Sequence, residues 1–236
     1  MAQTTTHPVA IVTGAGRGIG RATAIELSRL GYRLVLTSRT SAELDAVTRL
    51  VGQAVALPGD VTDPAHAQKL VAAAMERFGR VDALANIAGY APLLSVEQVT
   101  IDEWRKVLDT NLSAAFLTTK AVWPMFKQQK SGVIVNVSSV AARDPYPGLG
   151  IYGAAKAGLN ILGLALAREG DPLGIRVHTI APSATETEMF RGILSKEQVP
   201  TEKVLDPADV ARVIAACVTG DLRYTSGEVI YLHKKV

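Results

Sequence analysis

The 236-residue sequence predicts one α/β domain in which a doubly wound parallel β-sheet carries helices on both faces. Short β-branched runs alternate with longer helical patterns from the run at 9–12 to the run at 228–232. These runs are apolar at nearly every position, which is typical of parallel strands covered on both sides. No internal repeat and no linker-like composition divides the chain, so we expect a single domain over residues 1–236.

The expected elements follow from this alternation. Strands are predicted at 9–12, 33–36, 54–58, 81–86, 132–137, 175–180 and 228–232. Helices are predicted near 18–30, 41–51, 64–78, from 102 onward, 152–168 and 207–219. Pro64 suits the first turn of the third helix, and Gly79 suits its end. The stretch at about 182–206 has no regular pattern and is a candidate lid or substrate loop.

Composition narrows the classes of function. Hydrophobic residues make up 48% of the chain, enough for a large core, and the net charge of +3 comes from interspersed cations and anions rather than a basic stripe. Nucleic-acid binding is therefore not expected. Cys217 is the single cysteine, which excludes a disulfide framework and a cysteine-cluster metal site. No leader-like order of residues and no apolar run of about 18 residues is seen, so we expect a cytoplasmic protein without a membrane partner.

The segment "IVTGAGRGIGRATA" (11–24) places four glycines directly after the first strand, at Gly14, Gly16, Gly18 and Gly20. In a doubly wound fold this turn is where the pyrophosphate of a dinucleotide meets a helix N-terminus. The alternative is an ordinary tight turn with close helix–strand packing. The density of glycines favours the dinucleotide, although Ile19 stands where the third glycine of a GxGxxG pattern would fall.

Six further segments follow in order along the chain: "GDVTD" (59–63), "NIAG" (86–89), "DTNLSAAF" (109–116), "NVSS" (136–139), "YGAAK" (152–156) and "PSATETEM" (182–189). With the glycine loop they resemble the motifs of the short-chain dehydrogenase/reductase family over nearly the whole chain. The resemblance, strongest to members like the 3-oxoacyl-[acyl-carrier-protein] reductases, implies a Rossmann-type oxidoreductase that interconverts a carbonyl and a secondary alcohol. It also implies a homo-oligomer, a tetramer or a dimer, built through the helices that carry Asn111 and Tyr152.

The resemblance implies four catalytic residues: Asn111, Ser139, Tyr152 and Lys156. Tyr152 and Lys156 are four apart on a predicted helix, so they share one face. A neighbouring ammonium lowers the pKa of a phenol, and Tyr152 would then exchange a proton with the substrate oxygen. Ser139, with Ser138 as a neighbouring alternative, would hydrogen-bond that oxygen. Asn111 would bind a water that links Lys156 to solvent; the alternative is an asparagine that bonds local backbone.

The cofactor residues implied by the same motifs lie in the glycine loop, at the ends of the following strands and in the late loop. They are Gly14, Gly16, Arg17, Gly18, Ile19, Gly20, Ser38, Arg39, Asp60, Val61, Asn86, Ala88, Gly89, Tyr152, Lys156, Pro182, Thr185 and Thr187.

The residues that follow the second predicted strand indicate which nucleotide the protein prefers. An NAD-selective site usually has a carboxylate there that holds the ribose 2′-hydroxyl. Ser38 occupies that position, Arg39 follows it, and Arg17 is a second cation in the glycine loop. Two arginines attract a 2′-phosphate, so NADP(H) is favoured over NAD(H).

The substrate is expected to meet Ser139, Tyr90, Val140, Arg143, Tyr146 and Leu149 together with the loop at 189–200. Apolar walls with one arginine suit a medium-sized oxo compound such as a 3-oxoacyl thioester. Three departures from the family pattern stand out: Ser183 replaces a glycine, His178 replaces an asparagine, and the chain end lacks Asp-Gly-Gly. Two other functions stay open at this point: an NAD-dependent alcohol dehydrogenase, and a non-catalytic dinucleotide sensor.

Overall fold

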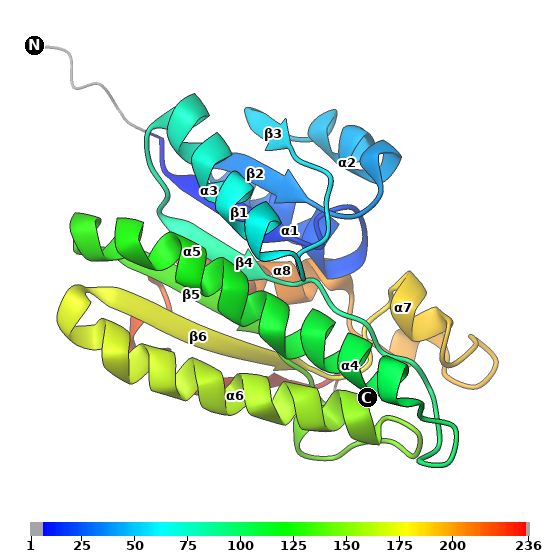
Figure 1. Cartoon of the computed structure of the whole chain (residues 1–236). Helices are drawn as coiled ribbons and strands as arrows, with labels where there is room; N and C mark the ends of the chain where they lie inside the picture. The colour runs from blue at the N-terminus through cyan, green and yellow to red at the C-terminus, as the bar shows by residue number, and fades with distance from the viewer. Residues whose placement is uncertain (1–6, 235–236) are drawn as a thin grey trace, which may run out of the picture.

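Seven parallel strands form one sheet in the computed structural model, which describes residues 7–234 (Figure 1). The strands are β1 (Val9–Thr13), β2 (Arg33–Thr37), β3 (Ala54–Ala56), β4 (Ala83–Asn86), β5 (Gly132–Val137), β6 (Ile175–Pro182) and β7 (Val229–Leu232). Their order across the sheet is β3-β2-β1-β4-β5-β6-β7. The chain moves outward from β1 to β3 and then returns to β4 on the other side of β1. This reversal creates a crevice at the carboxyl ends of β1 and β4, where doubly wound folds bind ligands.

Helices cover both faces of the sheet (Figure 1). They are α1 (Gly18–Arg29), α2 (Ser41–Thr48), α3 (Pro64–Phe78), α4 (Ile101–Leu108), α5 (Ala114–Gln129), α6 (Gly150–Gly170), α7 (Glu188–Arg191) and α8 (Pro207–Thr219). One core cluster joins the sheet to α1, α2 and α8, and the other joins it to α3, α5 and α6. The predicted single-domain α/β architecture with a doubly wound parallel sheet is confirmed.

Strand residues alternate between these two cores. Ala10 and Val12 of β1 belong to the first cluster, whereas Val9 and Ile11 belong to the second. All four are fully buried because both faces of the sheet are covered. The nearly continuous apolar character of the strands in the sequence follows from this double coverage.

Local signals set several helix ends. The side chain of Asp63 accepts a hydrogen bond of 2.9 Å from the backbone N–H of Ala65 and caps α3, and Gly79 ends the helix at φ +77°. The helix expected from residue 102 onward differs from the prediction. A π-helical turn, Asp109–Ser113, separates α4 from α5, and such turns are common at functional sites.

One helix, extended to Gly150–Leu173, is long and apolar enough to cross a membrane by length and composition. The expectation that no segment approaches this length was therefore wrong. The segment contains α6, whose inner side packs against β6 and whose Leu166 and Ala167 lie in the second core cluster. The core helix of a globular fold passes the same test of length and composition.

The structure shows what surrounds Cys217 and His178, two residues singled out in the sequence. Cys217 is buried in the first core cluster, and burial raises its pKa to about 12, which leaves the thiol protonated and unreactive. His178 is fully buried in β6, and its Nδ1 lies 3.0 Å from the hydroxyl of Thr225. Burial lowers the pKa of His178 to about 4, so the ring is neutral.

Candidate active site

A cavity of about 880 Å³ lies at the carboxyl ends of the strands. The glycine loop, the ends of β2 and β4, the segment after β5, the start of α6 and the loop after β6 all contribute to its wall. The sequence segments that resemble family motifs are thus brought together by the parallel sheet, because the carboxyl ends of its strands share one edge.

The glycine loop between β1 and α1 permits close approach of backbone to backbone. Gly14 has a φ of +65°, and a Cβ there would lie 2.9 Å from the Cα of Ala88. A Cβ on Gly20 would lie only 2.0 Å from the carbonyl oxygen of Gly14. Each of these glycines therefore makes room for main chain, and together they hold the start of α1 against the sheet.

The N-terminus of α1 fits a dinucleotide. Arg17 precedes the helix, and no side chain caps the first turn, which also lacks acidic residues. The unpaired N–H groups and the helix dipole of such a turn favour a phosphate anion. The cavity passes directly over this loop, so Gly16, Gly18 and Ile19 would hold the pyrophosphate.

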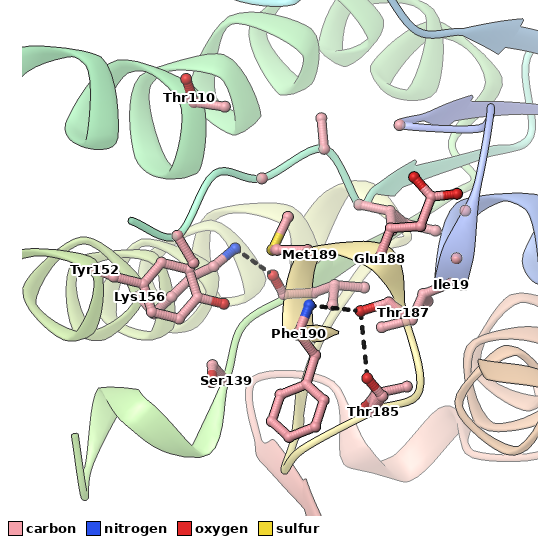
Figure 2. Close-up of a pocket in the computed structure, with 18 of the residues that line it drawn as sticks. Ile19, Thr110, Ser139, Tyr152, Lys156, Thr185, Thr187, Glu188, Met189 and Phe190 are labelled. Carbon is pink, nitrogen blue, oxygen red and sulfur yellow. Dashed lines mark hydrogen bonds between the residues drawn. The ribbon is translucent and has the colours of Figure 1, made fainter. Parts of the chain in front are cut away.

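Tyr152 and Lys156 lie one turn apart on α6 and face the cavity, as Figure 2 shows. The Nζ of Lys156 is buried, donates a hydrogen bond of 2.8 Å to the carbonyl of Val137, and lies 5.6 Å from the centre of the Tyr152 ring. Ser139 begins a short 3₁₀ turn after β5, and its oxygen accepts from the N–H of Ala141 at 3.1 Å. The three side chains converge from two separate segments of the chain.

Ser138 and Ser139 differ in their surroundings. The hydroxyl of Ser138 is buried and donates to the carbonyl of Lys156 at 3.2 Å. The hydroxyl of Ser139 acts on Tyr152 and lowers the pKa of the phenol. Of the two serines, Ser139 is the one placed beside the phenol.

The pKa values of Tyr152 and Lys156 differ from what the sequence predicted. Burial raises the pKa of Tyr152 to about 12, outweighing the opposite effect of Ser139. Burial also lowers the pKa of Lys156 to about 7. The prediction that Lys156 brings the pKa of Tyr152 down toward neutrality was wrong for this structure, because the loss of solvent opposes both charged forms. Tyr152 is a protonated phenol at neutral pH.

Asn111 lies in the π-helical turn and is 1% exposed. Its Oδ1 accepts from the N–H of Tyr90 at 3.2 Å, and its Nδ2 donates to the carbonyls of Tyr90 and Val107 at 2.7 and 2.9 Å. The side chain therefore holds the loop after β4 against the helix. It also borders Lys156: a Cβ built on Gly89 would lie 3.0 Å from the Asn111 Oδ1 and 3.8 Å from the Lys156 Nζ.

The far end of the cavity is lined by Ser38, Arg39 and Asp60. The sequence interpretation treated Arg17 as a second free cation at this end. In the structure its guanidinium forms an ion pair of 2.5 Å with Glu188, the first residue of α7. That pair links the glycine loop to the loop after β6, and it offsets one of the two positive charges counted from the sequence.

The loop after β6 is ordered by hydrogen bonds. Thr187 caps α7 by accepting from the N–H of Phe190 at 3.2 Å and donates to the carbonyl of Thr185 at 3.3 Å (Figure 2). The guanidinium of Arg191 makes two hydrogen bonds to Glu186, at 2.8 and 2.5 Å, and donates to the carbonyls of Ser195 and Val199. This one side chain ties both ends of the segment 186–199 together.

Replacing Arg191 with methionine is expected to loosen the segment 186–199, because the apolar stem is kept while the bonds to Glu186 and Val199 are lost. We expect tryptic cleavage after the exposed Lys196 to become about tenfold faster, since local opening limits cleavage of structured loops. Arg212→Met is the control, because within residues 7–234 the ion pair of Arg212 is with Asp209 on its own helix. Equal cleavage rates in both variants would contradict the role of Arg191.

Most of the residues predicted for the site line this cavity. They are Gly14, Gly16, Arg17, Gly18, Ile19, Gly20, Ser38, Arg39, Asp60, Val61, Ala88, Gly89, Ser139, Val140, Tyr146, Leu149, Tyr152, Lys156, Pro182, Thr185 and Thr187. Met189, Phe190, Ile193 and Leu194 of the loop predicted at 189–200 also line it.

Four predicted residues lie elsewhere. Asn111 and Asn86 border a small second cavity beside Lys156, and the Nδ2 of Asn86 donates to Asn136 in a buried network at 2.9 Å. Tyr90 turns away from the main cavity, and its hydroxyl bonds Glu103 at 3.1 Å. Arg143 also turns away and stacks on the ring of Tyr231 at 4.3 Å. The loops after β4 and β5 point these two long side chains outward, which their sequence positions do not reveal.

The wall also contains charged residues that sequence reasoning missed. They are Glu43 on α2, Glu188 on α7, Asp144 after β5, and Asp102, Arg105, Lys106 and Asp109 around α4. Asp109 and Glu188 lie inside the quoted motifs but were given no role there, and no motif marks the others.

Comparison with known proteins agrees with this geometry. The profile of the short chain dehydrogenase family matches residues 8–198. The chain is 33% identical to a 3-oxoacyl-[acyl-carrier-protein] reductase of Synechocystis sp., over 95% of this chain and 98% of that protein.

Two solved structures share the fold. The 3-ketoacyl-(acyl-carrier-protein) reductase of Brucella melitensis, complexed with NADH, superposes with a TM-score of 0.91 at 29% identity, covering 96% of this chain and 97% of its own. Levodione reductase superposes with a TM-score of 0.89 at 30% identity, covering 96% of each chain. The chain belongs to the short-chain dehydrogenase/reductase family and is an oxidoreductase that interconverts CH–OH and C=O groups with NAD(P)(H).

Proposed function

We propose that this protein is an NADP(H)-dependent reductase of a medium-sized ketone, acting through Ser139, Tyr152 and Lys156, with Asn111 in a supporting role. The observation that carries the proposal is the convergence of Ser139 and Tyr152 at one end of a cavity whose other wall is the glycine loop. Two related proteins that are named acyl-carrier-protein reductases support an oxoacyl substrate.

The nicotinamide of the bound cofactor would supply or accept the hydride. Ser139 would donate a hydrogen bond to the substrate oxygen and help to orient it. Tyr152, a protonated phenol at neutral pH, would deliver its proton to the same oxygen during reduction. Lys156 would bind the ribose hydroxyls beside the nicotinamide and hold the phenol in place, since its Nζ lies against the Tyr152 ring.

Asn111 holds the backbone of Tyr90 and borders the amine of Lys156. In this proposal it positions the loop after β4 and a water that passes protons between Lys156 and solvent.

The substrate would lie between the catalytic residues and the loop after β6. The wall there is apolar, formed by Val140, Leu149, Phe190, Ile193 and Leu194. Arg105 and Lys106 of α4 also line the cavity, and they form ion pairs of 3.8 and 3.5 Å with Asp102 and Glu103. The apolar wall suits the acyl chain of a 3-oxoacyl thioester.

NADP(H) is favoured in this proposal because Arg39 lines the cavity beside Ser38, where a carboxylate would exclude a 2′-phosphate. The related reductase complexed with NADH shows that the fold accepts the other nucleotide.

We further propose a cytoplasmic homo-oligomer, a dimer or tetramer, assembled through the outer sides of α5 and α6. Phe116 on α5 and Ile161 on α6 are 45% and 69% exposed, so each helix offers a large apolar side chain to a partner. Light scattering should give a mass at least twice 25.0 kDa, and Ile161→Glu should reduce it. A monomer in the wild type would contradict the assembly.

The proposed activity is tested by adding ketones and 3-oxoacyl thioesters to protein with NADPH or NADH and following nucleotide oxidation. Turnover with at least one oxo substrate is expected, with kcat/KM for NADPH above that for NADH. Nucleotide binding without turnover of any oxo compound would instead favour the dinucleotide sensor.

The pH dependence of the two directions should differ. The pKa of Tyr152, raised to about 12, keeps the phenol protonated below that pH, so kcat/KM for reduction should not rise between pH 7 and 9. Oxidation needs the phenolate, whose fraction grows about tenfold per pH unit below the pKa. The kcat/KM for alcohol oxidation should therefore rise across the same range. A flat oxidation profile would contradict Tyr152 as the group that titrates.

A further inference from the structure

The carboxylate of Glu43 lies against the glycine loop at the end of the cavity where Ser38 and Arg39 stand. A Cβ built on Gly16 would lie 2.5 Å from the Oε2 of Glu43 and 2.9 Å from the Oγ of Ser38. The two oxygens therefore share one side of Gly16, and both residues line the cavity. Glu43 comes from the first turn of α2, five residues beyond Ser38, the position where a cofactor-reading carboxylate is sought.

This carboxylate is free to accept hydrogen bonds. Among residues 7–234 no hydrogen bond or ion pair joins it to another side chain, whereas the hydroxyl of Ser38 donates to the carbonyl of Thr40. Arg17, the cation of the adjacent loop, is bound to Glu188 instead. An acidic residue in a first turn complements the helix dipole, but that effect does not require the side chain to fold back over Gly16.

The charges at this end of the cavity are mixed. Arg39 carries a positive charge, Glu43 and Asp60 each carry a negative charge, and Arg17 is paired with Glu188. In a doubly wound nucleotide site the group at the end of β2 meets the adenosine ribose: a carboxylate accepts from the 2′-hydroxyl, and an arginine binds a 2′-phosphate. Both chemistries are present here, a carboxylate on Glu43 and a guanidinium on Arg39.

We propose that Glu43 is a specificity-determining residue that accepts a hydrogen bond from the ribose 2′-hydroxyl of NAD(H) and repels the 2′-phosphate of NADP(H). Glu43 thereby limits the preference that Arg39 gives to NADP(H), and the protein uses both nucleotides. This inference rests on the proposed nucleotide-dependent function and adds the residue that sets its cofactor range.

The test is the binding of NADPH and NADH, followed by nicotinamide fluorescence, to the wild type, to Glu43→Gln and to Asp45→Asn. Glutamine keeps the shape of Glu43 and removes its charge. Asp45 is an exposed carboxylate two residues further along α2 that does not line the cavity, and residues two apart on a helix do not share a face. Asp45→Asn thus controls for the general loss of one negative charge.

In Glu43→Gln the ratio of Kd for NADH to Kd for NADPH should rise about tenfold, since a lost charged hydrogen bond and a relieved repulsion act in the same direction. Added salt should shrink the gain in NADPH affinity, because screening weakens the repulsion in the wild type. In Asp45→Asn the ratio should stay within about twofold of the wild type.

Two results would overturn the inference, and they are distinguishable. If the wild type binds both nucleotides and Glu43→Gln leaves the ratio unchanged, Glu43 does not read the ribose, while the proposed function stands. If the wild type binds neither nucleotide, the proposed function fails and the role of Glu43 fails with it.

Discussion

Replacing Tyr152 with phenylalanine is expected to lower kcat for carbonyl reduction by about 10³-fold, because a positioned proton donor contributes about 10²–10⁴ to such a rate. The ring of Tyr152 is retained, and with it the contact with the Lys156 amine. Nucleotide affinity should therefore stay within about threefold of the wild type, since only the hydroxyl beside Ser139 is lost.

Tyr146→Phe is the matched control for this variant. Tyr146 lines the same cavity, but it is 55% exposed. Its variant should keep kcat within a few-fold of the wild type. A Tyr152→Phe protein that turns over as fast as Tyr146→Phe would show that another group delivers the proton.

Replacing Gly20 with alanine is expected to have the largest effect on the nucleotide end of the site. The added Cβ would lie 2.0 Å from the carbonyl oxygen of Gly14 and 2.6 Å from its carbon, so main chain must move. Overpacking of this kind costs about 1–3 kcal/mol of unfolding free energy. The displaced loop should also weaken nucleotide binding by at least about tenfold, because the N–H groups of the turn would no longer converge on one anion.

Gly150→Ala provides the comparison, measured by denaturant unfolding and nucleotide titration. Gly150 begins α6, and a Cβ there would meet no atom within 4 Å. Its variant should be as stable as the wild type or more stable by about 0.4–1 kcal/mol, since alanine reduces the freedom of the unfolded chain. Similar losses in both variants would mean that the Gly14–Gly20 contact has no special role.

The sheet was predictable because its strands are buried on both faces. Val9–Thr13 and Gly132–Val137 are buried at every position, so their sequences are apolar runs rather than alternating patterns. Glycine and proline signals marked the ends of α3 equally well. The π-helical turn at Asp109–Ser113 carries no comparable mark, and the sequence suggested one continuous helix through it.

Within the candidate site, residues fixed by short-range geometry were predictable. Tyr152 and Lys156 share a helix face because they are four apart, and Ser139 reaches them because β5 ends beside the start of α6. The pKa of Tyr152 was not predictable in this way. Burial, which raises it, is a property of the folded chain and has no mark in the sequence.

Long charged side chains were the least predictable part of the site. Arg143 turns to the ring of Tyr231 and does not line the cavity, whereas Arg17 lines it as predicted but pairs with Glu188. Glu43, which no sequence motif singled out, also lines the cavity. The partners of Arg143 and Arg17 come near them only in the folded chain.

The most direct test of the proposed reaction is the fate of the hydride. A ketone substrate would be reduced with NADPH that carries deuterium at C4 of the nicotinamide, on one face or the other in separate samples, and the alcohol analysed by mass spectrometry. Deuterium from one face, and not from the other, should appear on the former carbonyl carbon. Alcohol that contains no deuterium from either face would contradict direct transfer between the nucleotide and the substrate.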